Sequence, residues 1–261
     1  MTVPENIPES ATVHQKSQRL WHQLRGPLLI MATLSITSIA AVVMLTVAFF
    51  TLFRTRRFYA EVLAKWPARA ILWMWGIRVT VHQDKPFPEE QTVYISNHTS
   101  TLDVFILMSL GLPNTRFFFW GGTRKWIPLT IICYLIGTFY TPSQKNRADR
   151  VRCFQSANRV LRRTKGSVYL SPEGVRVTTG KIGPFNKGAF HLATSLRVPI
   201  LPLYIKIPPE INPGTGLIPR PGMTHVYVKP EIPCHDWRLE DLVKNKEMVR
   251  EYYLSLHQKL Q

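Results

Sequence analysis

The chain has few cysteines and few acidic residues for its length. Only Cys133, Cys153 and Cys234 occur among 261 residues, and no two of them form a Cys-x-x-Cys pair. This scarcity argues against a disulfide-stapled scaffold and against a cysteine zinc site, and it predicts a folded part that faces a reducing compartment. The 16 Asp and Glu residues are outnumbered by 33 Lys and Arg, which gives a formal net charge of +17. Such a chain attracts acidic partners: nucleic acid, anionic lipid headgroups or phosphorylated small molecules.

Several standard motifs are also missing. The stretch from Gly174 to Lys181 has five residues before Gly180-Lys181 and is followed by Ile182, so it fails the phosphate-loop pattern. No Gly-x-Ser-x-Gly elbow of the serine hydrolases is present. Cys234-His235-Asp236 are adjacent residues in a Pro-rich region, which favours a surface loop over a metal site. Because no standard nucleic-acid-binding module is visible either, we expect no nucleic acid partner.

A long apolar run narrows the choice of acidic partner. Residues 26–53 contain no charged side chain, and a helix of that length spans about 42 Å, more than the ~30 Å hydrocarbon core of a bilayer. The run is too long for a cleavable signal peptide and ends in large apolar residues, so we predict a retained transmembrane anchor at 26–53. Residues 1–25 read as a flexible tail. Basic residues are more frequent after the anchor than before it, which predicts a single-pass protein whose catalytic domain faces the cytosol.

The region after the anchor divides in two. Residues 54–78 mix basic residues with Trp66, Trp73 and Trp75, a composition of interfacial helices broken near Pro67, although an ordinary packed helix pair fits equally well. Residues 79–261 form the predicted catalytic domain. Its stretch from residue 208 to 233 holds seven prolines and predicts an extended loop with at most one strand.

Short apolar runs alternate with helical stretches throughout residues 79–261. This alternation predicts an α/β domain with a largely parallel sheet flanked by helices. Residues 126–140 read as a buried or membrane-dipping segment, and a charged amphipathic helix follows Asp236. The expected strands are 79–82, 92–96, 116–119, 167–170, 200–205 and 225–229, and the expected helices are 102–110, 148–163 and 186–196.

A histidine and an aspartate lie five residues apart after the second expected strand. His98 ends this strand and Asp103 falls at the start of the next helix, so the turn between them can fold the carboxylate onto the imidazole. Such a pair makes a general base without a serine, and the nucleophile is then a hydroxyl of the substrate. Two alternatives remain: Asp103 only caps its helix beside a structural histidine, or Asn97-His98-Thr99 is a glycosylation sequon.

A second polar loop follows another expected strand, at Ser171 to Arg176. In a parallel sheet this loop emerges at the same edge as His98. An arginine there grips phosphate with two parallel hydrogen bonds, and Gly174 lets the backbone approach a ligand closely. The alternative is a turn in which Glu173 and Arg176 pair with each other. Lys145 to Lys165 adds eight basic residues and one acid, which fits a solvated helix face or an attraction for phosphates.

These segments, in this order, resemble the glycerolipid acyltransferase family over roughly residues 80–205. The family's Asn-His-x-Ser-x-x-Asp motif is met at residues 97–103, by Asn97, His98, Ser100 and Asp103. Its Pro-Glu-Gly-Thr-Arg motif is met at residues 172–176, with Val175 in place of threonine, and its Val-Pro-Ile-x-Pro motif at residues 198–202. The resemblance implies an α/β sheet with an apolar acyl groove.

The resemblance also implies an activity and a site. His98 is the expected base, Asp103 orients it, and the Glu173-Gly174-Arg176 loop contacts the acceptor phosphate. Asn97 and Ser100 are also expected at the substrate. The implied partners are an acyl-CoA or acyl-ACP donor, a lysolipid acceptor such as 1-acylglycerol-3-phosphate, and a bilayer with anionic lipids.

The expected chemistry requires no cofactor. A thioester is already activated, so a positioned base and hydrogen-bond donors for the oxyanion are enough, and we expect those donors among the backbone amides that start the Asp103 helix. One family motif departs from the pattern. Many relatives carry an arginine six residues after a glycine, whereas the segment from Gly137 to Ser143 has none, and Lys145 or Arg147 would have to replace it.

The missing arginine leaves other functions open. It favours, as an alternative, an acyltransferase for a lysophospholipid with a larger headgroup or for a lyso-amino-acid lipid. A third alternative is a non-catalytic membrane protein that binds anionic lipids through its basic surface, against which the presence of both His98 and Asp103 counts.

Overall fold

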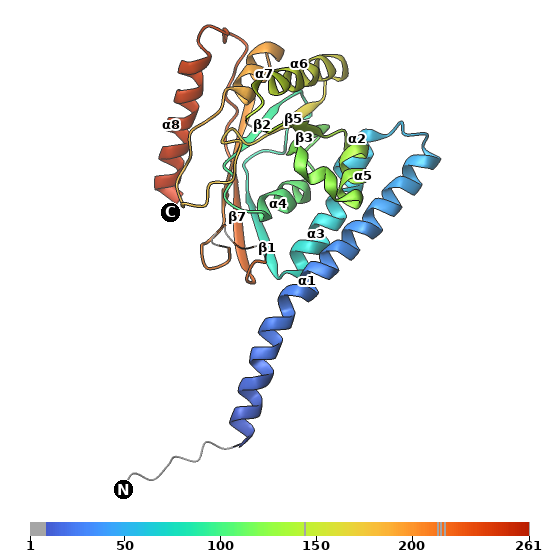
Figure 1. Cartoon of the computed structure of the whole chain (residues 1–261). Coiled ribbons are helices and arrows are strands. Elements are labelled where there is room, and N and C mark those ends of the chain that lie inside the picture. The colour runs from blue at the N-terminus through green and yellow to red at the C-terminus, as the bar shows by residue number, and fades with distance from the viewer. Residues whose placement is uncertain (1–8, 144, 213, 215, 217, 261) are drawn as a thin grey trace.

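Figure 1 presents the computed structural model of the chain, which describes residues 9–143, 145–212, 214, 216 and 218–260, with the backbone alone over 9–24. Its centre is one seven-stranded sheet in the order β1-β7-β6-β2-β5-β3-β4. Five adjacent strands, β6, β2, β5, β3 and β4, run parallel, and β7 and β1 run opposite to them. The strands are β1 Ile77–His82, β2 Val93–Ser96, β3 Thr115–Trp120, β4 Phe139–Thr141, β5 Ser167–Tyr169, β6 Ile200–Lys206 and β7 Gly222–Val228.

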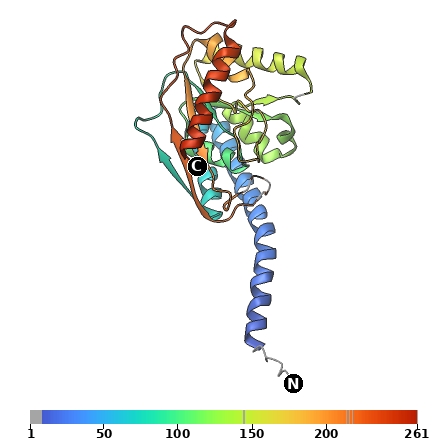
Figure 2. The ribbon, with the colours of Figure 1, turned by 90° about the vertical axis from the view of Figure 1, so that its left-hand side faces the viewer.

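Helices cover both faces of this sheet, which predicts strands that are apolar on both sides. In β2, Tyr94 enters the core shared with one helical layer, while Val93 and Ile95 enter the core shared with the other. One layer holds α1, α3, α4 and α5, and the other holds α6, α7 and α8, as Figures 1 and 2 show. The helices are α1 Glu9–Phe50, α2 Arg56–Phe58, α3 Lys65–Met74, α4 Leu102–Leu110, α5 Ile127–Ile136, α6 Arg147–Thr164, α7 Gly188–Leu196 and α8 Leu242–Leu260.

The predicted fold class is confirmed, and its six expected strands and three expected helices are present within three residues of their predicted bounds. Short β4 at the sheet edge was not expected, because three residues between a helix and a loop carry too weak a pattern. Residues 126–140, expected as a single buried or membrane-dipping segment, divide into α5 and β4 at Gly137, which has a left-handed φ of 76°.

The region before the sheet also differs in detail from the expectation. The backbone is helical from Glu9, so the tail expected over residues 1–25 is helical over residues 9–25, and residues 1–8 lie outside the described chain. The break expected near Pro67 comes earlier, where the π-helical segment η1, Tyr59–Leu63, meets α3. Pro67 itself occupies the first turn of α3, where its missing N–H removes no helical hydrogen bond.

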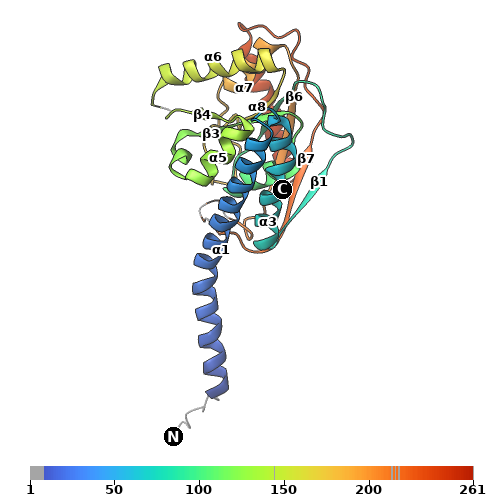
Figure 3. The ribbon, with the colours of Figure 1, turned by 90° about the vertical axis from the view of Figure 1, so that its right-hand side faces the viewer.

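Within α1, the stretch Arg25–Phe50 is long and apolar enough to cross a membrane. One of its faces packs on the domain: Ala41, Met44 and Ala48 are buried in the core with α3 and α5. The Trp75 indole N–H of the neighbouring segment donates to Thr33 Oγ1 at 3.1 Å. Its other face is apolar and exposed, and Figure 3 shows the amino-terminal half of α1 extending away from the domain. The apolar helix is therefore partly built into the domain.

The last helix is tied to the centre of the sheet by one tyrosine. Tyr253 in α8 is fully buried, and its hydroxyl lies 3.0 Å from Ile95 O in β2 and 2.9 Å from Leu203 O in β6. Because β2 carries His98 at its end, this contact fixes α8 to the strand that positions the candidate base.

We predict that Tyr253→Phe lowers the free energy of unfolding by about 1–2 kcal/mol, because it removes a buried hydrogen-bond donor and leaves two carbonyl oxygens without it. Denaturant unfolding in detergent measures this change. Tyr252→Phe, on the same helix and with its hydroxyl in no hydrogen bond that the described residues show, is the matched control. Equal stability of the two variants would contradict the prediction.

Candidate active site

His98 and Asp103 meet at the carboxyl end of β2. Their contact is a hydrogen bond of 2.8 Å between His98 Nδ1 and Asp103 Oδ2. Asp103 lies in the first turn of α4, where the positive end of the helix dipole favours a carboxylate. The Asp103 side chain is 1% exposed and that of His98 is 28% exposed. The carboxylate is thus sealed in the protein, while the imidazole reaches solvent.

This contact decides which imidazole nitrogen is free to accept a proton. An ionised carboxylate only accepts hydrogen bonds, so Nδ1 carries the proton and donates to Asp103 Oδ2. Nε2 then holds a lone pair. When Nε2 takes a proton, the adjacent carboxylate stabilises the imidazolium that forms. This geometry matches the predicted pairing of a base with an orienting carboxylate.

Backbone amides hold the carboxylate in place. Asp103 Oδ2 also accepts hydrogen bonds from the amides of Thr99 at 2.8 Å and Ser100 at 3.0 Å. The Leu102 amide donates to Ser100 Oγ, and the Asp103 amide to Ser100 O. These four amides, which we expected as oxyanion donors, are therefore committed within the turn. The turn therefore uses its backbone N–H donors to hold Asp103 in position.

The backbone of His98 is clamped by the second polar loop. Its amide donates to Glu173 Oε2 at 2.6 Å, and its carbonyl oxygen accepts from the Val177 amide at 2.7 Å. Glu173 Oε1 accepts from the Gly183 amide at 2.8 Å. Both carboxylate oxygens of Glu173 are thus occupied by backbone, and the residue is 3% exposed. Burial raises the pKa of this carboxyl group, and the hydrogen bonds from Gly183 and His98 oppose that rise.

Asn97 and Ser100, expected at the substrate, have structural partners. The Asn97 side-chain amide pairs with the backbone of Ile205 in β6, donating to its oxygen and accepting from its nitrogen at 2.9 and 2.8 Å. The Ser100 hydroxyl caps the start of α4 by accepting from the Leu102 amide at 3.0 Å. Both residues are buried, and their hydrogen-bond partners are backbone groups of β6 and of the start of α4. Asn97, Ser100 and Glu173 therefore hold the backbone on both sides of His98 in place.

Gly174 and Arg176 are exposed on the loop that clamps His98. Gly174 has a left-handed φ of 68° in the turn that its amide closes on Ser171 O. Arg176 immediately precedes Val177, whose amide is bonded to His98 O, so residues 98 and 176 lie on the same side of the molecule. The structure therefore brings His98, Asp103, Gly174 and Arg176 together. The described residues show no ion pair between Glu173 and Arg176, since Glu173 is buried against backbone amides and Arg176 is exposed.

Sequence reasoning missed the contribution of the Pro-rich loop. Gly214 in this loop lies against the turn, and a Cβ atom there would approach Thr99 O to 2.7 Å and the Thr178 side chain to 3.0 Å. Its φ of 84° also favours glycine. Thr99 and Gly214 lie more than a hundred residues apart in sequence. The seven prolines of the loop, which restrict its backbone, were the only sequence feature that indicated an ordered loop.

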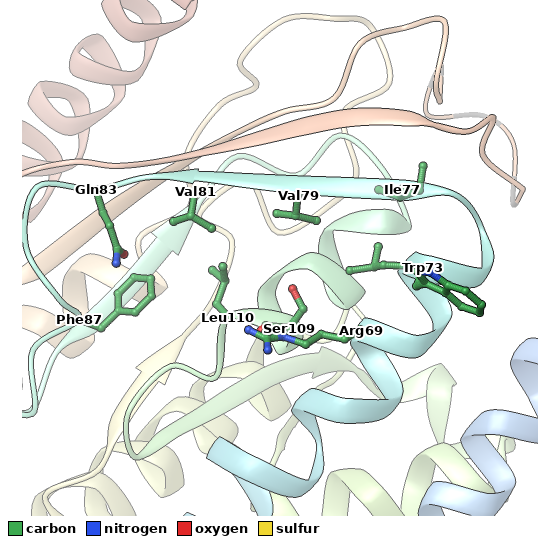
Figure 4. A pocket seen from close by; sticks show the side chains of 10 residues that line it. Arg69, Trp73, Ile77, Val79, Val81, Gln83, Phe87, Ser109 and Leu110 are labelled. Carbon is green, nitrogen blue, oxygen red and sulfur yellow. Dashed lines mark hydrogen bonds between the residues drawn. The ribbon is translucent and has the colours of Figure 1, made fainter.

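Two cavities lie away from these residues. The first, of about 420 Å³, lies between α3, α4 and β1, and Figure 4 shows Val79, Phe87 and Leu110 around it with Arg69 beside Ser109. The second, of about 590 Å³, lies beside α5 and β4 and contains three arginines. Neither is lined by His98 or Arg176. The lining of the first mixes apolar side chains with Arg69, Gln83 and Ser109, and that of the second has no acidic residue among the described residues.

Comparison with known proteins agrees with this architecture. The Acyltransferase family model matches residues 78–206. A 1-acyl-sn-glycerol-3-phosphate acyltransferase of Limnanthes alba is 29% identical over 194 residues, which are 70% of this chain and 65% of that protein. The alpha enzyme of that name from Homo sapiens is 28% identical over 197 residues, 73% of this chain and 67% of that protein. The match thus spans just under two thirds of the plant relative's length.

A solved structure resembles the fold. The 1-acyl-sn-glycerophosphate acyltransferase PlsC from Thermotoga maritima superposes with a TM-score of 0.72, at 19% sequence identity. The alignment covers 90% of this chain and 97% of that one. At this identity the likeness concerns the arrangement of helices and strands.

We predict that Glu173→Gln destabilises the protein by about 1–3 kcal/mol, because the amide nitrogen of glutamine faces a backbone N–H that needs an acceptor. Since burial raises the pKa of Glu173 above its unfolded value, the stability it contributes is greatest at low pH and falls as pH rises through the raised pKa. The difference in unfolding temperature between wild type and Glu173→Gln should therefore narrow from pH 5 to pH 8. A difference that widens over this range would contradict the assignment.

Proposed function

Because the chain belongs to the glycerolipid acyltransferase family, we propose that it transfers a fatty acyl group from a thioester donor to the hydroxyl of a lysophospholipid. The acceptor supported best is 1-acylglycerol-3-phosphate, the substrate in the names of the plant and human relatives, and the product is then phosphatidic acid. The single observation that carries this proposal is the hydrogen bond between His98 Nδ1 and the buried Asp103 carboxylate, with the imidazole open to solvent.

The chemistry follows from that geometry. His98 Nε2 removes the proton of the acceptor hydroxyl as its oxygen attacks the thioester carbonyl carbon. Asp103 stabilises the resulting imidazolium. The tetrahedral intermediate then collapses, the C–S bond breaks, and the proton held on Nε2 passes to the departing thiolate. The products are the new ester and the free thiol of coenzyme A or of acyl carrier protein.

The acceptor phosphate is placed by the loop at residues 174–176. Arg176 is exposed beside His98 and presents the planar fork of donors that matches a phosphate group. Val175 and the lack of an arginine between Gly137 and Ser143 favour, as a second candidate, a lysolipid with a different headgroup. Both candidates use the same base and the same acyl transfer.

The apolar face of α1 attaches the protein to a membrane that contains anionic lipids. Phe49, Phe50, Leu52 and Phe53 are exposed on and just after α1, and Trp73 in α3 is 82% exposed. Arg54, Arg57 and Lys65 follow the apolar run and suit lipid phosphates at a cytosolic surface. A single crossing with the domain in the cytosol stays our prediction. Protease protection of the amino terminus in sealed vesicles tests it.

We predict that His98→Ala lowers acyl transfer by about 10²–10⁴-fold, the usual contribution of a general base. The assay follows thiol release from acyl-CoA with 1-acylglycerol-3-phosphate, and a parallel series uses acyl-ACP to identify the donor. His191→Ala, which removes an exposed histidine from α7, is the matched control and should keep wild-type activity. A His98→Ala variant as active as this control would refute the mechanism.

Arg176→Gln is predicted to raise KM for the phosphate-bearing acceptor about tenfold or more, with a smaller effect on kcat, because the arginine binds the headgroup and takes no part in proton transfer. Arg159→Gln removes an equal charge from the exposed surface of α6 and controls for net charge. Testing wild type against a panel of lysolipids separates the two acceptor candidates. A drop in kcat alone would move Arg176 out of the acceptor site.

A further inference from the structure

A second cavity lies beside the edge strand β4. It has a volume of about 590 Å³ and is lined by residues of α5, β3 and β4 and of the chain just after α1. Figure 3 shows the arrangement of α1, α5, β3 and β4. Its lining includes three arginines and no Asp or Glu. The three arginines are Arg56, Arg116 and Arg124.

Two of these guanidinium groups are half-buried side by side. Arg56 donates to Ile136 O at 3.3 Å and to Asn114 Oδ1, and Arg116 donates to Gly137 O at 3.1 Å. Both rest on Gly137, where a Cβ atom would come within 1.9 Å of Arg116 Nη1 and 3.1 Å of Arg56 Cδ. A glycine at this point is what lets both cations enter the cavity wall.

The positive charge of this pair is poorly compensated. Burial and the neighbouring Arg116 lower the pKa of Arg56 to about 10, and burial lowers the pKa of Arg116. The carboxylate of Glu61 is engaged by Arg57 and by the Asn114 amide. Arg116 Nε is buried and has no hydrogen-bond partner among the described residues. A half-buried pair of cations without a facing carboxylate is costly, and a bound anion offsets that cost.

The part of the cavity at Arg116 is remote from the candidate active site. Arg116 is the second residue of β3, whereas His98 follows the last residue of β2, and both strands run parallel to β5 between them. The amino end of one parallel strand and the carboxyl end of another lie at opposite edges of the sheet. An anion held by Arg116 therefore lies near the amino ends of the parallel strands, whereas the candidate base lies near their carboxyl ends.

We propose that this three-arginine cavity binds the phosphate group of an anionic membrane lipid. Arginine forks match phosphate oxygens, and the side chains of Arg56 and Arg116 both line the cavity. Phe53 and Tyr134 form part of the lining and are 51% and 74% exposed, so the cavity opens on an apolar rim next to the end of α1. This arrangement suits a headgroup whose acyl chains stay in the bilayer. The lipid source rests on the proposed membrane attachment, while the anion site does not.

Binding of soluble short-chain lipids to the full-length protein in neutral detergent tests the proposal. Dioctanoyl phosphatidic acid, dioctanoyl phosphatidylcholine and inorganic phosphate are titrated by calorimetry. Because the acyl-acceptor site also takes phosphate, all variants are built on Arg176→Gln. We expect Arg116→Gln to weaken phosphatidic acid binding at least tenfold and Arg159→Gln, the charge-matched control on α6, to change it less than twofold. Phosphatidylcholine should bind at least tenfold more weakly than phosphatidic acid.

Other results would overturn either the site or the lipid source of its anion. Equal binding of phosphatidic acid to the Arg116→Gln and Arg159→Gln variants overturns the site. Inorganic phosphate that binds as tightly as phosphatidic acid overturns the lipid source. If Arg116→Gln fails to fold, Arg116→Lys keeps the charge and loses the planar fork, and a fall in affinity of several-fold is then expected. Failure of the acyl-transfer assay leaves these binding results unaffected, so the two proposals fail separately.

Discussion

The hydrogen bond between Asp103 and His98 is the contact on which the candidate site depends. It holds the imidazole in one tautomer, and it does so only because the turn from Thr99 to Asp103 wraps the carboxylate with backbone amides. A buried carboxylate without these donors would take up a proton or leave the interior. The start of α4 therefore places a carboxyl group five residues after the candidate base, and it uses for this the amides that an oxyanion hole would otherwise need.

A second carboxylate, Glu173, fixes the same histidine through its backbone. The two acids lie on either side of His98, one bonded to its ring and one to its amide. The negative charge of Asp103 adds to the burial that raises the pKa of Glu173. The ring of His98 and its main chain are thus held by separate elements, α4 and the loop at residues 173–177. Such double support restricts the motion of the candidate base, which proton transfer at a defined atom would require.

The two ends of the parallel strands carry side chains of opposite charge. At the carboxyl edge of β2, buried carboxylates surround a histidine, and Arg176 is the cation presented to solvent by the adjoining loop. At the amino edge of β3, two half-buried arginines face a cavity whose lining includes no carboxylate. Helix α1 borders the second edge and shares its core with α3 and α5. The proposed membrane attachment and the proposed anion site therefore involve the same helical layer, while α6, α7 and α8 cover the other face.

Local pattern determined much of this protein. Short β-branched and apolar runs that alternate with amphipathic stretches predicted the strands, the helices and the largely parallel sheet. The reason is that strands apolar on both faces are typical of parallel sheets covered by helices on each side. Short spacing likewise predicted the meeting of His98 and Asp103, since five residues fit one turn. Only the tertiary structure decided that Asn97 and Glu173 bind backbone, that Gly214 reaches Thr99, and that Arg56 joins Arg116. These contacts join segments that lie 10 to 115 residues apart, and their partners are main-chain atoms or like charges, which no sequence pattern identifies.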